Sequence, residues 1–177
     1  TAWERLDPSF FQYEQGQGSP PKIVTKLWTL QKPSIAAVNG HAYGIGHGIA
    51  TSCDFRVASE KAGFCEAFIR TGFLPGDGST WQLPKLIGYS HTLMMQFTGE
   101  PIDGNEAYRI GLANKVVPHE QLMDATLELA TKLAHGPTYQ MALIKMLVHK
   151  GYTTTFNDHF NDMHRAGAIA RATEDHK

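Results

Sequence analysis

A glycine-rich segment between Pro33 and Asp54 constrains the fold of this chain more than any other part of the sequence. Pro33 ends the preceding element, and the apolar run Ser34–Val38 predicts a short buried strand. An Asn-Gly turn signal and alternating glycines follow, and the stretch to Cys53 predicts a short helix. The alternating glycines are Gly44, Gly46 and Gly48. The segment therefore predicts a strand, a glycine turn and a helix in close succession.

A glycine turn that opens a helix presents free backbone N–H groups and the positive end of the helix dipole. Such a turn can cradle a phosphate, or it can hold the charge that develops on a thioester enolate. The dinucleotide fingerprint GxGxxG is broken here, because Ile49 stands where its third glycine belongs, and no GxxxxGK[ST] motif occurs. The sequence therefore favours a site that stabilises a thioester enolate over a site that binds a phosphate. Close packing of a helix on a sheet is the alternative that involves no ligand.

Length and composition predict an ordinary globular protein with one core. The chain has 177 residues, of which 42% are hydrophobic and 19% are charged. A net charge of −1 gives no electrostatic case for a nucleic-acid or membrane partner. The two cysteines, Cys53 and Cys65, do not suggest a disulfide framework, so a reducing compartment is expected. No apolar run is long enough for a membrane span, and no signal peptide is visible.

Strands and helices alternate along the chain, which predicts an α/β layer. Strands are expected at residues 34–38, 55–58, 63–65 and 112–117. Helices are expected at residues 22–30, 45–53, 79–87, 90–97 and 103–111, followed by longer ones at about 122–133, 141–150 and 154–172. The helix around residues 141–150 is apolar nearly all round, so it should be buried in the core or at a subunit contact. Residues 1–20 are expected to form a lid or linker.

The order of motifs closely resembles the crotonase (enoyl-CoA hydratase/isomerase) superfamily. The resemblance covers about residues 23–177 and rests on NGHAYGIGHGIATSCDFRVASEKAGF, FLPGDGSTWQLPKLIG and FTGEPIDGNEAYRIGLANKVVP. It implies an α/β crotonase-like spiral of ββα units over residues 1–117 and a C-terminal helical region over residues 118–177. Members have a further upstream half-domain that residues 1–32 do not match, so the chain looks N-terminally truncated.

The resemblance also implies an oxyanion site. Family members hold the carbonyl oxygen of a CoA thioester between two backbone N–H groups while enolate charge develops. One donor is the middle residue of the glycine turn, which is Ile45 here, between Gly44 and Gly46. A side chain at this position leaves the N–H in place. The second donor belongs to the upstream half-domain.

Family hydratases position the attacking water with two glutamates, and both are missing here. Their positions hold Gly48 and Phe68. Because acid–base catalysis needs a titratable group within reach of the substrate, the two-glutamate hydration mechanism is not expected. Phe68 is expected to make the acyl pocket more apolar, and His41 to line it; His47 is an alternative to His41.

Two carboxylates near the same site are candidate acid–base groups. Asp77 is preferred; it lies in a PGDG loop of the form that carbon–carbon hydrolases of the superfamily share. Ordinary turn chemistry is the alternative explanation for an Asp before a Gly. Glu66 is second; it lies near the end of a predicted strand, where members often carry Gln, and an exposed or structurally paired Glu is the alternative there.

The sequence therefore predicts an enoyl-CoA hydratase/isomerase-type enzyme that acts on an acyl-CoA thioester through a stabilised enolate. A carbon–carbon hydrolase of the same fold and a CoA-binding scaffold without hydratase activity are the alternatives. No cofactor is expected beyond the CoA of the substrate, and no metal, because no His or Cys pair has ligand spacing. The resemblance implies a homotrimer or hexamer, in the cytoplasm or an organelle matrix.

Overall fold

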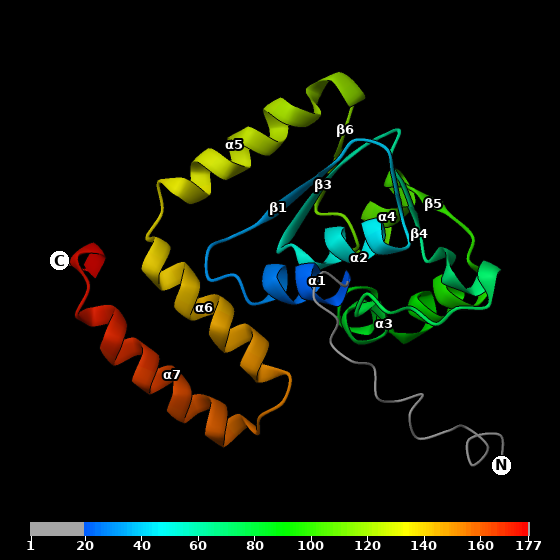
Figure 1. Ribbon diagram of the computed structural model, residues 1–177. Helices are drawn as coiled ribbons and strands as arrows, with labels where there is room; N and C mark the ends of the chain where they lie inside the picture. Colours follow the sequence, from blue (N-terminus) through cyan, green and yellow to red (C-terminus); the bar gives the residue numbers. More distant parts are fainter. Residues whose placement is uncertain (1–19, 177) are drawn as a thin grey trace, which may run out of the picture.

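A computed structural model describes residues 20–176, which form two small sheets flanked by helices (Figure 1). The first sheet is parallel and has the order β1 (Ile35–Val38), β3 (Phe55–Ser59), β6 (Lys115–Val117). The second has the order β2 (His41–Tyr43), β4 (Gly63–Cys65), β5 (Ile102–Asp103), in which β4 runs parallel to β2 and antiparallel to β5.

The chain steps from one sheet to the other twice in the same way. From β1 it turns into β2 and then enters helix α2 (Ile45–Ser52); from β3 it turns into β4 and then enters the short 3-10 helix η3 (Ala67–Thr71). Because β1 pairs with β3 and β2 pairs with β4, the two passages lie side by side. This repeat is the ββα spiral that the resemblance implies.

The remaining helices surround the sheets. They are α1 (Pro20–Trp28), α3 (Ser79–Thr98), α4 (Gly104–Arg109), α5 (Leu122–Ala134), α6 (Thr138–Gly151) and α7 (Phe156–Arg171), with 3-10 turns η4 (His119–Gln121) and η5 (Glu174–His176). Asp103 caps α4, since its Oδ1 accepts a hydrogen bond of 2.8 Å from the N–H of Glu106. None of the helices described is both long and apolar enough to cross a membrane.

The main core lies between the sheets and helices α2, α3 and α4. Its centre includes Phe64 of β4, Leu83 of α3 and Leu112, all without exposed surface. A second, smaller cluster joins Val57 and Val117 of the first sheet to Leu122, so α5 covers the other face of that sheet. Strand β1 packs against both clusters, which explains why it is a continuous apolar run.

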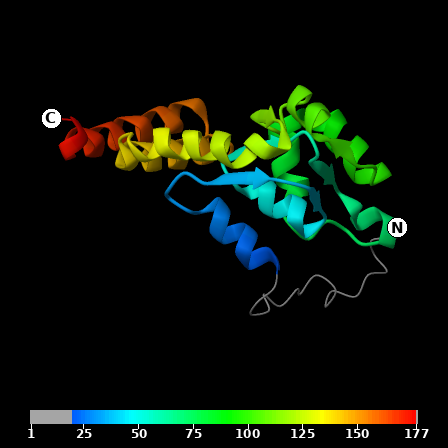
Figure 2. The same cartoon turned by 90° about the horizontal axis from the view of Figure 1, so that it is seen from above.

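The C-terminal helices α6 and α7 pack against each other and form an arm that extends away from the sheets (Figure 2). No residue of α6 is fully buried, and Ile144 and Val148 keep 60% and 54% of their surface exposed. The prediction that this helix lies in the core of the chain is wrong, because the arm meets only part of its apolar surface. A subunit contact remains the other prediction.

Most of the expected elements are confirmed, but several differ. The short strands β2 and β5 were not expected, and the strand expected at residues 112–117 is limited to β6. The two helices expected between residues 79 and 97 are one element, α3, which is interrupted at Gly88 (φ 77°, ψ 169°). The N-cap of α3 is Gly78, and no side chain caps this end of the helix. The lid or linker expected at residues 1–20 lies almost wholly outside the described residues.

Candidate active site

The N-terminus of α2 is open. Its N-cap is Gly44, whose backbone angles (φ 51°, ψ −120°) are accessible almost only to glycine and which has no side chain to cap the helix. The first N–H bonded to a carbonyl of this turn is that of Gly48, which donates to Gly44 O at 3.1 Å. Ile45 is the first residue of α2, so its N–H has no acceptor within the helix.

Two hydrogen bonds anchor this first turn to the end of β4. The N–H of Gly44 donates to the carbonyl oxygen of Cys65 at 2.9 Å. At the next residue, directly after β4, Glu66 Oε1 lies 2.5 Å from Nδ1 of His47, and neither side chain has any exposed surface. A backbone bond and a short side-chain bond thus join consecutive residues of one strand end to the same helical turn.

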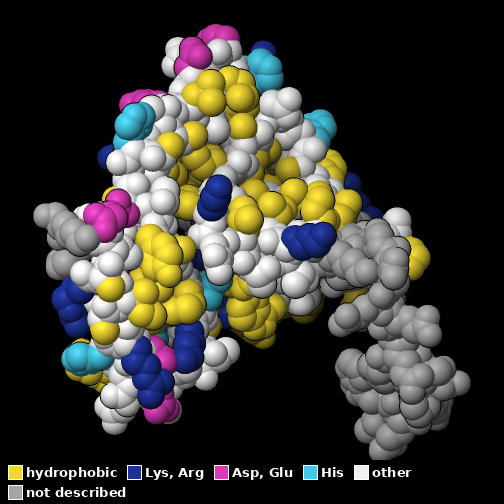
Figure 3. Space-filling view, turned by 60° about the vertical axis from the view of Figure 1, so that its left-hand side comes forward, with side chains coloured by type: hydrophobic (Ala, Val, Ile, Leu, Met, Phe, Trp, Pro, Cys, Tyr) yellow, Lys and Arg dark blue, Asp and Glu magenta, His cyan; other side chains and the backbone are white. Residues whose placement is uncertain are grey.

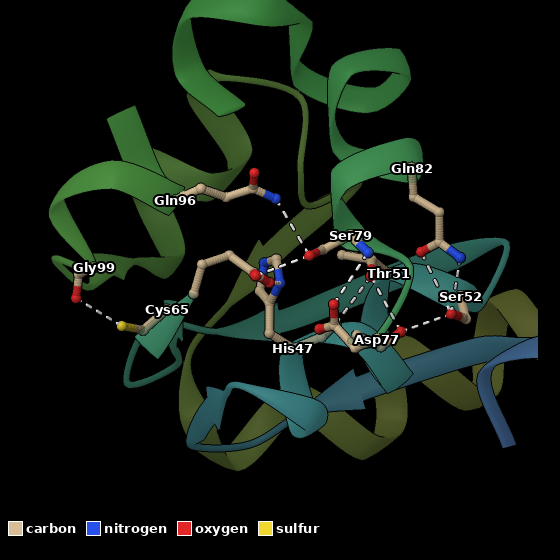
Figure 4. Close-up of polar contacts among 11 residues, drawn as sticks. His47, Thr51, Ser52, Cys65, Asp77, Ser79, Gln82, Gln96 and Gly99 are labelled. Carbon is tan, nitrogen blue, oxygen red and sulfur yellow. Dashed lines mark hydrogen bonds and ion pairs between the residues drawn. The ribbon is translucent and has the colours of Figure 1, made fainter. Parts of the chain in front are cut away.

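The second oxygen of Glu66 extends this network to α3. Ser79 Oγ donates to Glu66 Oε2 at 2.8 Å, and Gln96 Nε2 donates to Ser79 Oγ at 3.3 Å (Figure 4). Oε2 of Glu66 therefore accepts a hydrogen bond from Ser79, and Oε1 shares a hydrogen bond with Nδ1 of His47. We assign Nδ1–H as the donor in the second contact, because a carboxylate then accepts at both of its oxygens.

Asp77 lies against the same network from the loop before α3. Its Oδ1 accepts a hydrogen bond of 3.1 Å from the N–H of Ser79, the first residue of α3. Oδ2 of Asp77 and Nε2 of His47 are buried and have no hydrogen-bond partner among the described residues. The carboxylate also packs directly on Gly48, because a Cβ there would lie 2.7 Å from Cγ of Asp77 and closer still to its Cβ and Oδ2.

His47 lies close to both carboxylates. In the described part of the chain no Lys or Arg forms an ion pair with Glu66 or Asp77, whereas one ring nitrogen of His47 and one oxygen of each carboxylate all lie within 4.8 Å of one another. Three such groups resemble a metal site. However, Nδ1 and both oxygens of Glu66 are already hydrogen-bonded, which leaves two free atoms, fewer than the three protein ligands typical of a catalytic zinc.

The neighbouring thiol takes no part in this network. Cys65 Sγ donates to the carbonyl oxygen of Gly99 at 3.0 Å, which ties β4 to the end of α3, and burial raises the pKa of the Cys65 thiol. Both cysteines are free thiols.

The structure brings together most of the residues that the sequence singled out. Gly44, Ile45 and Gly46 form the open turn, and the ring of Phe68 lies beside it, 3.7 Å from where a Cβ on Gly44 would be. His41 lies elsewhere, on an exposed part of β2 where its ring stacks on Tyr43.

Glu66 and Asp77 belong to one cluster, but both are fully buried. It therefore remains a prediction that one of these two carboxylates faces a cavity lined by the Ile45 N–H. Sequence reasoning missed His47 as the partner of Glu66, and it missed Ser79 and Gln96. Glu66 and His47 are 19 residues apart and no local spacing rule joins them.

Comparisons with known proteins agree with this architecture. A crystal structure described as enoyl-CoA hydratase subunit I from Geobacillus kaustophilus HTA426 matches 98% of this chain and 66% of its own, with a TM-score of 0.85 and 33% identity. The fold is therefore the crotonase fold. The profile described as Enoyl-CoA hydratase/isomerase matches residues 9–166, and the chain belongs to that family.

Curated relatives are similar over part of their length. The short-chain-enoyl-CoA hydratase of Clostridium acetobutylicum is 41% identical over 130 residues, which are 73% of this chain and 50% of the relative. The crotonyl-CoA hydratase of Syntrophomonas wolfei is 34% identical over 156 residues, which are 88% of this chain and 60% of the relative. The chain thus spans half to three fifths of the length of these two relatives.

Proposed function

We propose that this chain provides the acyl-CoA chemistry of its family: it binds a CoA thioester and stabilises the enolate formed from it. The observation that carries the proposal is the open first turn of α2, whose Ile45 N–H has no acceptor within its helix, set directly against a buried imidazole–carboxylate cluster. Donors fixed before the reaction stabilise developing charge at little reorganisation cost.

In the proposed mechanism the thioester oxygen accepts a hydrogen bond from Ile45 N–H. The Cα–H bond breaks, its electron pair passes into the enolate, and the proton goes to Oδ2 of Asp77, the oxygen without a partner. With a β,γ-enoyl thioester the electron pair is delocalised as a dienolate, and return of the proton to the γ-carbon completes an isomerisation. In hydration, water adds to the β-carbon of an α,β-enoyl thioester and loses a proton to the base, the electron pair of the double bond passes into the enolate, and protonation of the α-carbon completes the reaction. Asp77 has no exposed surface, so substrate contact requires the residues that cover its carboxylate to shift.

Glu66 is the second candidate for the acid–base role, but its two oxygens are occupied by His47 and Ser79. Asp77 is therefore preferred. The Asp77 loop also keeps a second activity open, the carbon–carbon hydrolysis of a 1,3-diketone. A scaffold that binds CoA without turnover is the alternative that involves no catalysis.

Deuterium exchange tests the proposal. Full-length protein is incubated with a saturated acyl-CoA in D₂O, and incorporation at the α-carbon is followed by mass spectrometry. Asp77→Asn should slow exchange by about 10²-fold while thioester binding changes little, the usual size of a lost acid–base group. The matched control is Asp103→Asn, another aspartate that accepts a backbone N–H at a helix start.

The outcomes separate the candidate functions. Exchange in the unmodified protein supports the enolate mechanism, and equal exchange in Asp77→Asn would reduce Asp77 to a turn residue. Cleavage of a 1,3-diketone substrate without activity on enoyl-CoA would identify a hydrolase. Binding of CoA without exchange or cleavage would identify a scaffold.

We further propose a homotrimer or a pair of trimers, located in the cytoplasm or an organelle matrix. Support for assembly comes from the apolar side chains exposed on the face in Figure 3 and, along α6, from Ile144, Met146 and Val148. Light scattering of the full-length protein tests the assembly, and a monomer would contradict it.

A further inference from the structure

The direction of the Ile45 N–H depends on how the first turn of α2 is held. At that end the helix has no side-chain cap, and its attachments to β4 are the bonds from Gly44 to Cys65 O and from His47 to Glu66. His47 lies two residues after Ile45, within the same turn. A rotation or shift of this turn therefore moves the imidazole and the Ile45 N–H together.

The ring of His47 is held mainly through one atom. Nδ1 makes the 2.5 Å contact with Glu66, whereas Nε2 has no hydrogen-bond partner in the described part of the chain. The edge of Phe64 packs on the ring, with centroids 6.1 Å apart. Glu66 is in turn held by Ser79, the first residue of α3. The orientation of the first turn of α2 therefore depends on the position of the start of α3.

The other end of α2 has an independent attachment to the same helix. Ser52, the last residue of α2, accepts a hydrogen bond of 3.1 Å from Gln82 Nε2 of α3, and Ser52 is almost fully buried. This pair joins α2 to α3 as the His47 network does, but at the end of the helix remote from Ile45. It provides a matched control.

We propose that His47 and Glu66 are positioning residues for the oxyanion donor. They fix the first turn of α2 so that the Ile45 N–H points at the thioester oxygen, and they do so without touching the substrate. The inference rests on the proposed function. A displacement of about 1 Å at such a donor is enough to cost about 10²-fold in rate.

The test measures polarisation of the bound carbonyl directly. Full-length protein is saturated with cinnamoyl-CoA, whose conjugated thioester absorbs at longer wavelength when its carbonyl oxygen accepts a strong hydrogen bond. His47→Leu should lose more than half of the wavelength shift and about 10²-fold in kcat, while the dissociation constant of the thioester changes less than about threefold. Ser52→Ala should keep the full shift.

A pair of amide variants controls for folding. His47→Asn keeps an N–H donor at the δ position and should retain most of the shift, whereas His47→Gln moves the donor to the ε position and should lose it. A full shift in folded His47→Leu, or equal shifts in the two amide variants, would overturn the inference. Unmodified protein that binds the thioester with no shift would instead overturn the oxyanion placement in the proposed function.

Discussion

Replacement of Gly48 by Ala should destabilise the protein through Asp77. A Cβ at position 48 would lie 2.7 Å from Asp77 Cγ and closer to its Cβ and Oδ2, where ordinary contact begins at 3.4 Å. Because Asp77 is buried and bonded to the N–H of Ser79, its carboxylate cannot swing away freely. Helix α2 and the Asp77 loop must therefore separate by up to about 1 Å, as for other overpacked cores.

The magnitude follows from two opposing effects. Overpacking of this kind costs about 1–3 kcal/mol. Ala is the better helix former by about 1 kcal/mol, which offsets part of the cost. The free energy of unfolding should therefore fall by up to about 2 kcal/mol, or by up to about 8 °C in Tm for a protein of this size.

Denaturant unfolding of the full-length protein measures this change, with Gly46→Ala as the control. A Cβ at position 46, in the same helix, meets nothing within 4 Å, so this variant should be neutral or slightly stabilised. In double variants Asp77→Gly should relieve the Gly48→Ala defect, and Asp77→Ala should not, because the Cβ contact remains. Equal stability of Gly48→Ala and Gly46→Ala would refute the argument.

Three further outcomes follow from the structure. Gly44→Ala should lower the free energy of unfolding by about 1–3 kcal/mol, because φ is 51° there, and denaturant titration checks this. With Gly48 and Phe68 in place of the family glutamates, hydration of crotonyl-CoA in a spectrophotometric assay should be slow; fast hydration would contradict this. A hydrogen bond from Lys150 of α6 lowers the pKa of Asp162 in α7. The stabilisation that this link gives to the two helices is therefore complete above the unfolded carboxyl pKa of about 3.9, and it is lost as the pH falls through the lowered pKa of the folded state. In this acidic range, amide hydrogen exchange in α7 should become faster in the unmodified protein, and it should depend less on pH in Asp162→Asn.

Local patterns predicted the elements that local chemistry determines. Pro33 precedes the start of β1, the glycine turn precedes α2, and Asp103 with Glu106 marks the start of α4. Strand β2 escaped prediction because three residues between Gly40 and Gly44 carry no periodic pattern, and its pairing with β4 is a long-range contact. The strand propensities of single residues are weak predictors of such short strands.

The candidate site was predictable as a set of residues but not as a network. The glycine turn and the two carboxylates are visible in the sequence, while the contact between His47 and Glu66 exists only because β2 and β4 lie parallel. Ser79 shows the same limit: its hydroxyl does not cap α3 but donates to Glu66, a residue 13 positions earlier in the chain.

The central claim is that the Ile45 N–H receives the thioester oxygen, and a crystal structure of the full-length protein with a non-reactive acyl-CoA analogue tests it most directly. The account predicts the carbonyl oxygen about 2.7–3.1 Å from the Ile45 nitrogen, with the acyl α-carbon on the side of Asp77. A carbonyl oxygen bound elsewhere, or an Ile45 N–H bonded to a carbonyl of the protein itself, would contradict the account.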